Sequence, residues 1–201
     1  MNKQKSVLKY IVAGRITRDY IITPDGRSII DIQGGNLLYA ASGLRLWDDQ
    51  IGLLSVISED YPVEWLEEVG RKGFDLRGIQ SVTPPFDQRF FIAFPNPYEH
   101  DLKNPISHFS RINEAMPKDL LGYNAENNAN PNNPAQPVII IKDIPFDYLD
   151  VTAVHISALD FISQSRLPSF FRQGHASTIT LLASDEYMNT TYSELVPTIL
   201  K

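Results

Sequence analysis

The sequence predicts an α/β fold in which helices cover both faces of a mostly parallel β-sheet. Short apolar runs typical of buried strands alternate with stretches whose apolar residues recur at helical spacing. This alternation is typical of parallel sheets, whose neighbouring strands are joined by helical crossovers. With 201 residues, 43% hydrophobic and 21% charged, the chain also has the composition of a globular domain.

Apolar runs of strand length, bounded by glycine, proline or polar residues, predict the first strands. These runs are Val7–Val12, Tyr20–Thr23, Ser28–Ile32, Ile51–Ile57 and Gln88–Phe94. The second and third are expected to pair as a hairpin, because the turn sequence Pro24-Asp25-Gly26 lies between them. Later in the chain the alternation resumes with the runs "PVIII", "TAVHIS" and "TITLL".

Helices are predicted between these runs. One is expected to begin at Gly35 with Leu37, Ala41 and Leu44 on one face, and another has Pro62 in its first turn. The second should end at Arg71-Lys72-Gly73, since basic residues followed by glycine are typical of helix C-termini. Two more helical stretches are expected around Phe161–Arg172 and near Tyr192–Leu200.

The segment Pro95–Pro137 interrupts this pattern. It is rich in asparagine and proline and includes "YNAENNANPNNPAQP". A segment of this composition buries too little apolar surface to pack. We therefore expect a long surface insertion or a disordered loop, and the most mobile internal region of the chain.

Charge and cysteine content exclude several classes of function. Eighteen basic and 24 acidic residues give a net charge of -6, and no basic stripe is present, so a broad nucleic-acid surface is not expected. The apolar run after the first lysines is too short for a signal peptide or a membrane span, which predicts a cytoplasmic protein. Without cysteine, disulfides and thiolate chemistry are excluded, and the four histidines show no metal-ligand spacing.

A candidate binding site is expected where the strands of the parallel sheet end. Gly14, the hairpin with Asp19 and the pair Gly34-Gly35 should gather at the carboxyl ends of the strands, where ligands bind in such folds. Paired glycines let a ligand approach the backbone, and an acid accepts hydrogen bonds from hydroxyl groups, which suits a polyol. Alternatively, Asp19 only ends a strand and the glycines only form a turn.

At these residues the chain resembles the ribokinase and phosphofructokinase-B (PfkB) family of carbohydrate kinases. The resemblance is carried by "IVAGRITRDYII", "GGNLLYAASGLRLW" and "IGLLSVISEDYPVEWLEEVGRKGFDLRGIQ", and less specifically by "AVHISALDF". It covers residues 8–83 well and 137–200 loosely. It implies a ribokinase-like, three-layer α/β/α domain with a small β lid, whose strands would lie at about 15–33 and 86–94, with residues 95–137 as an insertion.

The resemblance also implies functional residues. In the family, an aspartate five residues after the glycine that ends the first strand binds substrate hydroxyls, which corresponds to Asp19 after Gly14. The family's glycine pair, which the sugar approaches, corresponds to Gly34 and Gly35, and Asn36 follows directly. We therefore expect Asp19, Gly34, Gly35 and Asn36 to bind substrate, with ATP and Mg²⁺ as the cofactors of full-length members.

The family's Gly-Ala-Gly-Asp segment, which supplies the catalytic base and the anion hole, does not occur in this sequence. The resemblance thus implies an incomplete domain over residues 1–201 that lacks the C-terminal portion and the ATP-binding half, so no catalytic, nucleotide-binding or metal-binding residue is assigned. A truncated chain, a split gene product and a degenerate relative all fit.

Two functions remain open. The chain is expected to be the substrate-binding portion of a PfkB-type carbohydrate or nucleoside kinase, inactive alone. The alternative is a non-catalytic sugar-binding or interaction module derived from the same fold. The expected partners are a small sugar or nucleoside, and either a second copy bound through the lid or the missing C-terminal half.

Overall fold

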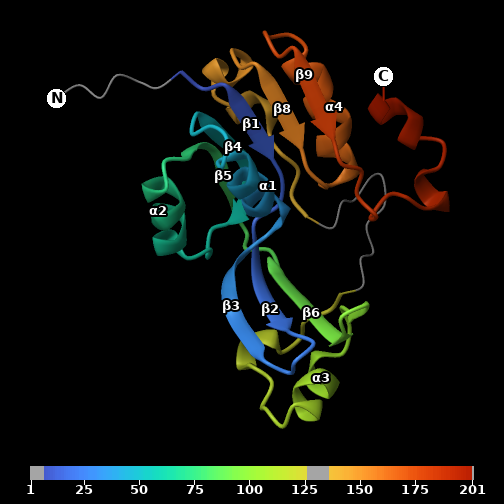
Figure 1. Cartoon of the computed structure of the whole chain (residues 1–201). Coiled ribbons are helices and arrows are strands. Elements are labelled where there is room, and N and C mark those ends of the chain that lie inside the picture. Colours follow the sequence, from blue (N-terminus) through green and yellow to red (C-terminus); the bar gives the residue numbers. More distant parts are fainter. Residues whose placement is uncertain (1–6, 126–135, 201) are drawn as a thin grey trace.

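The computed structural model describes residues 7–125 and 136–200 and contains two sheets (Figure 1). The first has five strands in the order β5-β4-β1-β8-β9, and the second has four in the order β3-β2-β6-β7. Every neighbouring pair in the first sheet is parallel. The predicted α/β fold with a mostly parallel sheet is confirmed.

The first sheet is built outward from its central strand. Its members are β1 (Tyr10–Ala13), β4 (Ile51–Ser58), β5 (Asp75–Val82), β8 (Ala153–Ile156) and β9 (Thr178–Leu181). From β1 the chain passes through β4 to the edge at β5, then crosses to β8 and β9 on the other side. The strand order therefore changes direction beside β1, and ligands of open α/β sheets bind at such a point.

Helices cover both faces of this sheet, which gives three layers. The helices are α1 (Asn36–Leu44), α2 (Val63–Arg71) and α4 (Phe161–Phe171). Leu53 packs on one face in the same cluster as Leu37 of α1, whereas Leu54 packs on the other face in the cluster that contains Leu167 of α4. All eight residues of β4 are buried, as expected for a strand covered on both faces.

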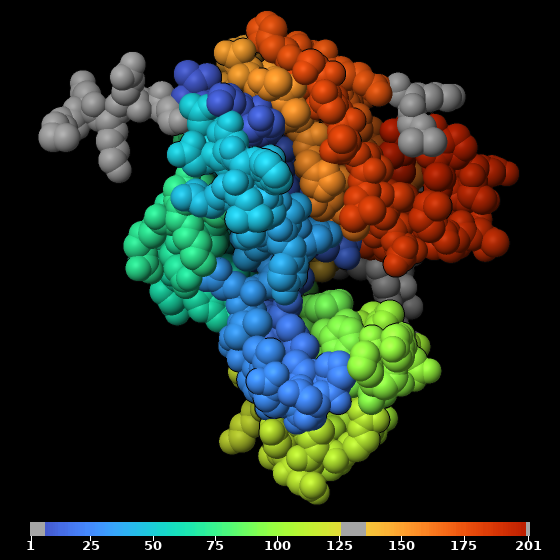
Figure 2. Space-filling model, in the orientation of Figure 1, coloured from blue at the N-terminus to red at the C-terminus, as the bar shows by residue number. Residues whose placement is uncertain are grey.

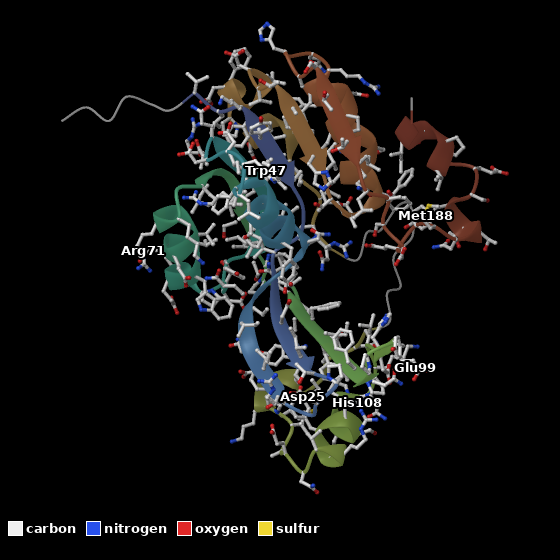
Figure 3. The ribbon with its side chains drawn as sticks, viewed as in Figure 1. Asp25, Trp47, Arg71, Glu99, His108 and Met188 are labelled. Atoms are coloured by element: carbon white, nitrogen blue, oxygen red, sulfur yellow. The ribbon has the colours of Figure 1, made fainter. Side chains whose placement is uncertain are left out.

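The second sheet lies below the first in Figure 1 and forms the lower lobe in Figure 2. Its strands are β2 (Thr17–Ile22), β3 (Ser28–Gly34), β6 (Arg89–Asn96) and β7 (Glu99–Asp101). The predicted β2–β3 hairpin is confirmed as an antiparallel pair. Its turn contains Gly26 with a φ of 78°, which glycine adopts readily. Asp25 in this turn and His108 lie in the lower part of the molecule (Figure 3).

The expectation that residues 95–137 cannot pack is wrong for the described residues 95–125. This stretch contains β7, the helix α3 (Pro105–Arg111) and a 3₁₀ turn at Lys118–Leu120. Phe109 and Leu120 are 1% and 2% exposed and pack against Phe91 of the second sheet. The asparagine-rich centre of the predicted loop, residues 126–135, lies outside the described residues.

Three other elements differ from the predictions: β5, the run "PVIII" and the C-terminal helix. The strand β5 was not predicted, because Arg77, Gly78 and Gln80 interrupt its apolar pattern. The run "PVIII" forms no strand. Instead, the Gln80 side chain bonds both the N–H and the carbonyl of Ile140, at 2.8 and 2.9 Å.

Short 3₁₀ turns make up much of the remaining chain. They lie at Ile141–Asp143, Phe146–Leu149, Thr190–Tyr192 and Val196–Leu200. The last two replace the expected C-terminal helix. Of the helices in the described part of the chain, none is long and apolar enough to cross a bilayer.

Replacing Phe109 by alanine tests the packing of α3 on the second sheet. We expect Phe109→Ala to lower the free energy of unfolding by about 3 to 5 kcal/mol, since a fully buried ring leaves a cavity. Urea denaturation followed by circular dichroism measures the change. Ile106→Ala, in the same helix but 60% exposed, is the control and should have little effect. Equal small losses in the two variants would show that α3 is not part of the core.

Candidate functional site

The candidate site lies where the chain leaves the first sheet after β1. Residues 14–16 lead directly from β1 into β2, so the first residues of the second sheet stand above the carboxyl end of the first. A cavity of about 330 Å³ opens there. We call it the Asp19 cavity, and it is lined mainly by Arg15, Thr17, Asp19, Gly35, Asn36 and Tyr39, with Phe90 and Arg89 of β6 and Gln136.

Asp19 is the buried acid of this cavity, with 3% of its surface exposed. Its carboxylate accepts hydrogen bonds from the Thr17 hydroxyl, from the Tyr39 hydroxyl at 3.5 Å and from the backbone N–H of Gly35. Burial raises the pKa of Asp19, and the hydrogen bonds oppose that rise. In the described part of the chain no basic group pairs with this carboxylate, so the donors around it are neutral hydroxyl and amide groups.

The glycine pair is required by close contacts within the chain. A Cβ atom on Gly34 would lie 1.9 Å from Oδ2 of Asp19, so a side chain at this position would displace the carboxylate. Gly35 has a φ of 101°, and a Cβ atom there would lie 2.2 Å from the carbonyl oxygen of Arg15. Asp19, Gly34 and Gly35, singled out from the sequence, therefore meet at one point.

Asn36 joins two loops at the end of the sheet. Its Oδ1 accepts a hydrogen bond from the N–H of Arg15, and its Nδ2 donates to the carbonyl of Ala158, both at 2.7 Å. These bonds tie the connection after β1 to the connection after β8. Gly14 leaves room for this, since a Cβ on it would lie 2.6 Å from Oδ1 of Asn36. Both ends of the Asn36 amide are thus bonded to the chain, and its contact with substrate stays a prediction.

Several side chains at the site were not selected from the sequence, among them Tyr39 and Arg15. Tyr39 lies one helical turn after Gly35, a spacing that places both on the same side of α1 and could have been noticed. Arg15 pairs with Glu186, which lies far away in sequence after β9. The carboxylate of Glu186 is largely buried, and no local pattern predicts such a long-range pair.

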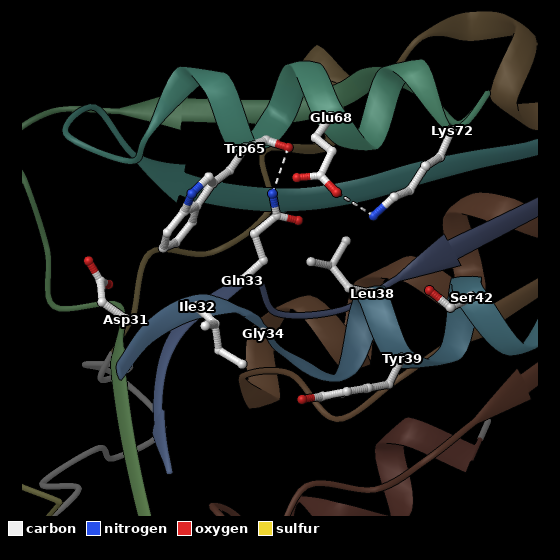
Figure 4. A pocket seen from close by; sticks show the side chains of 10 residues that line it. All are labelled: Asp31, Ile32, Gln33, Gly34, Leu38, Tyr39, Ser42, Trp65, Glu68 and Lys72. Carbon is white, nitrogen blue, oxygen red and sulfur yellow. Dashed lines mark hydrogen bonds and ion pairs between the residues drawn. The ribbon is translucent and has the colours of Figure 1, made fainter. Parts of the chain in front are cut away.

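A second, larger cavity of about 430 Å³ is lined by Gly34 and shares Tyr39 with the Asp19 cavity (Figure 4). We call it the outer groove; its main lining residues are Asp31, Gln33, Leu38, Trp65, Glu68 and Lys72. Its acids already have cationic partners: Asp31 pairs with Arg18 at 2.7 Å and Glu68 with Lys72 at 2.8 Å. Because Asp19 alone among these acids is buried without a cation, the smaller cavity is the stronger candidate for hydroxyl recognition.

No cluster of three histidine, aspartate or glutamate side chains suited to a metal ion occurs in residues 7–125 and 136–200. The two arginines of the Asp19 cavity are already paired, Arg15 with Glu186 and Arg89 with Asp87. The described residues thus provide a buried acceptor for hydroxyl groups in the Asp19 carboxylate.

An alanine at Gly34 tests the contact with Asp19. We expect Gly34→Ala to lower the free energy of unfolding by about 1 to 3 kcal/mol, because the added methyl group collides with a buried carboxylate. The control is Gly43→Ala in α1, where a Cβ meets nothing within 4 Å and where alanine should stabilise by roughly 0.5 to 1 kcal/mol. Urea titrations give both values. If Gly34→Ala left the free energy of unfolding unchanged, the Asp19 carboxylate would not lie against Gly34.

Comparison with known proteins gives one match in sequence and many in structure. No protein-family model matches the chain. A cytidine kinase from Thermococcus kodakarensis is 32% identical over 74 residues, which are 37% of this chain and 26% of that protein. The matched segment is thus about a quarter of the relative's length.

Solved structures match over nearly the whole chain. A PfkB protein from Polaromonas sp. JS666 is 13% identical with a TM-score of 0.61, covering 96% of this chain and 62% of that one. Ribokinase from Giardia lamblia is 14% identical with a TM-score of 0.60, covering 97% and 55%. A sugar kinase from Pyrococcus horikoshii is 15% identical with a TM-score of 0.59, covering 94% and 60%.

Some of the similar structures contain nucleotide. The Pyrococcus horikoshii sugar kinase has been solved with ATP, and a ribokinase from E. coli with ATP and Mg²⁺. In each case this chain spans less than two thirds of the matching protein. The resemblance seen in the sequence is confirmed at the level of structure: the chain has the ribokinase-like fold of the PfkB sugar kinases.

Proposed function

We propose that this chain binds a small polyol, a sugar or a nucleoside, in the Asp19 cavity, as the substrate-binding part of a PfkB-type ATP-dependent kinase. The observation that carries the proposal is the Asp19 carboxylate, which is buried without a cation against Gly34 and Gly35. It lies beside the point where the strand order of the parallel sheet changes direction, and the fold is that of solved sugar kinases.

The chemistry of the cavity suits neighbouring hydroxyl groups. The two oxygens of a carboxylate can accept hydrogen bonds from two adjacent hydroxyls, and bonds to a charged acceptor are stronger than neutral ones. The hydroxyls of Thr17 and Tyr39 donate hydrogen bonds to Asp19. When substrate binds, they can rotate and accept hydrogen bonds from its hydroxyl groups instead. Phe90, 36% exposed, offers an apolar surface for the carbon skeleton or a base.

Phosphoryl transfer depends on positioning and on the neutralisation of phosphate charge by cations. In the described part of the chain the arginines of the cavity are already paired with acids, and no group of three histidine, aspartate or glutamate side chains suited to a metal ion occurs. We therefore assign substrate binding, and no step of the transfer, to these residues.

Replacing Asp19 by asparagine separates binding from folding. We expect Asp19→Asn to weaken binding roughly ten- to a hundredfold, because a charged hydrogen bond contributes about 1.5 to 3 kcal/mol. Calorimetry against a panel that includes cytidine, ribose and fructose measures the affinity. An affinity equal to that of the parent would remove Asp19 from the site.

The same variant should keep or gain thermal stability at neutral pH. Burial raises the pKa of Asp19 above its ordinary value of 3.8, so the folded state holds this proton more tightly than the unfolded state. As pH rises through the raised pKa, ionisation therefore costs folding stability, and asparagine avoids that cost. The control for the binding measurement is Asp31→Asn, whose side chain lines the outer groove. If Asp31→Asn weakened binding and Asp19→Asn did not, the ligand would bind in the outer groove.

The second candidate function is a non-catalytic sugar-binding or interaction module. It differs from the kinase portion because a module would show no phosphoryl transfer even with a complementary chain. We expect the purified 201-residue chain to transfer no phosphate from ATP to any member of the panel, because the Gly-Ala-Gly-Asp segment that supplies the family's catalytic base and anion hole does not occur in its sequence. A coupled assay for ADP formation checks this. Turnover that disappears in Asp19→Asn would contradict it and assign the whole reaction to this chain. Binding with turnover only after a complementary chain is added favours the kinase portion over the module.

A further inference from the structure

The two sheets are joined at a buried side-chain amide that belongs to neither cavity lining described above. Gln88 comes just before β6 and is 5% exposed. Its Oε1 accepts a hydrogen bond from the N–H of Ser58 at 2.6 Å, and its Nε2 donates to the carbonyl of Ile16 at 2.9 Å. Its backbone carbonyl accepts from the N–H of Arg18 at 2.8 Å.

These three bonds connect different parts of the molecule. Ser58 is the last residue of β4 in the first sheet, Ile16 lies in the connection between β1 and β2, and Arg18 belongs to β2 of the second sheet. A further bond in the same place runs from the N–H of Phe86 to the Ser58 hydroxyl at 3.2 Å. Gln88 therefore holds the end of β4 close to β2 and β6, the two strands of the second sheet whose residues line the Asp19 cavity.

We propose that Gln88 is a positioning residue that sets the orientation of the second sheet above the Asp19 cavity. Buried polar groups fully satisfied by hydrogen bonds define a unique arrangement, since any other arrangement leaves donors and acceptors unpaired in an apolar surrounding. Rotation of the second sheet away from β4 would break the bond between the Gln88 side chain and Ser58, whereas the bond from Arg18 of β2 to the Gln88 carbonyl would move with the sheet. The role belongs to the free chain and does not depend on which ligand binds.

The chain offers a matched control. Gln80 on β5 is 9% exposed, and its amide also makes two hydrogen bonds to backbone, at 2.8 and 2.9 Å. Both of those bonds go to Ile140, which is part of neither sheet and whose neighbours Ile139 and Ile141 pack in the core of the first sheet. Loss of either amide removes the same kind and number of bonds, but only the loss at Gln88 acts between the sheets.

The absence of cysteine in the sequence allows site-specific spin labelling. Glu67→Cys on α2 and Ser107→Cys on α3 place labels on exposed positions of the two parts. We expect Gln88→Met, which keeps the length of the side chain, to widen and shift the distance distribution between the labels measured by pulsed electron paramagnetic resonance. Gln80→Met should lower the melting temperature by a similar few degrees and leave the distribution as in the parent.

Gln88→Asn and Gln80→Asn repeat the comparison if a methionine variant does not fold. Asparagine is one methylene shorter, so it keeps a polar group in the site but cannot reach Ser58 and Ile16 together. A distribution that widens in the Gln88 variant alone supports the proposal. A parental distribution in the Gln88 variant, or equal widening in both, overturns it.

Discussion

The contact between the Asp19 carboxylate and the backbone of Gly34 is the constraint on which the candidate site depends. It requires that residue 34 have no side chain, and it places a buried acid directly beside the start of α1. Because Asp19 and Gly34 lie on the paired strands β2 and β3, a change in their register would turn the carboxylate to the other face of the sheet. The register of the β2–β3 hairpin therefore determines on which face of the sheet the Asp19 carboxylate lies.

Side-chain amides, in addition to apolar packing, connect the elements around this contact. Asn36 ties the ends of β1 and β8, Gln88 ties β4 to the second sheet, and Gln80 holds the stretch that contains Ile140. Strand ends carry backbone groups that no ladder satisfies, and a buried amide supplies one donor and one acceptor in a single side chain. Each amide therefore fixes the position of the strand end or loop to which it bonds.

Local patterns predicted much of the fold. The continuous apolar run of β4 and the turn sequence between β2 and β3 each carry their own signal, and both elements were found. The strand β5 was missed because Arg77 and Gln80 make side-chain bonds outside the sheet and so break the apolar pattern. Phe109 was missed because the composition of residues 95–137 was averaged over a stretch whose apolar residues are concentrated near α3. At the site, Asp19 and the glycines were selected from their places at expected strand ends and from the resemblance to the PfkB family, whereas the pair of Arg15 with Glu186 depends on tertiary structure alone.

The parallel pairing of β2 with β6 has a consequence for the order of folding. The hairpin of residues 17–34 is made early in the chain, but its partner strand at residues 89–96 arrives only after β4, α2 and β5. A two-stranded hairpin is marginal in water by itself, and pairings distant in sequence form slowly. During synthesis the hairpin therefore lacks its parallel partner until β4, α2 and β5 have been made. Ile29, Ile30 and Ile32 of the hairpin are 36 to 39% exposed even in the folded chain. Until β6 arrives, the unpaired edge of β2 and these apolar side chains together offer other chains a surface for pairing.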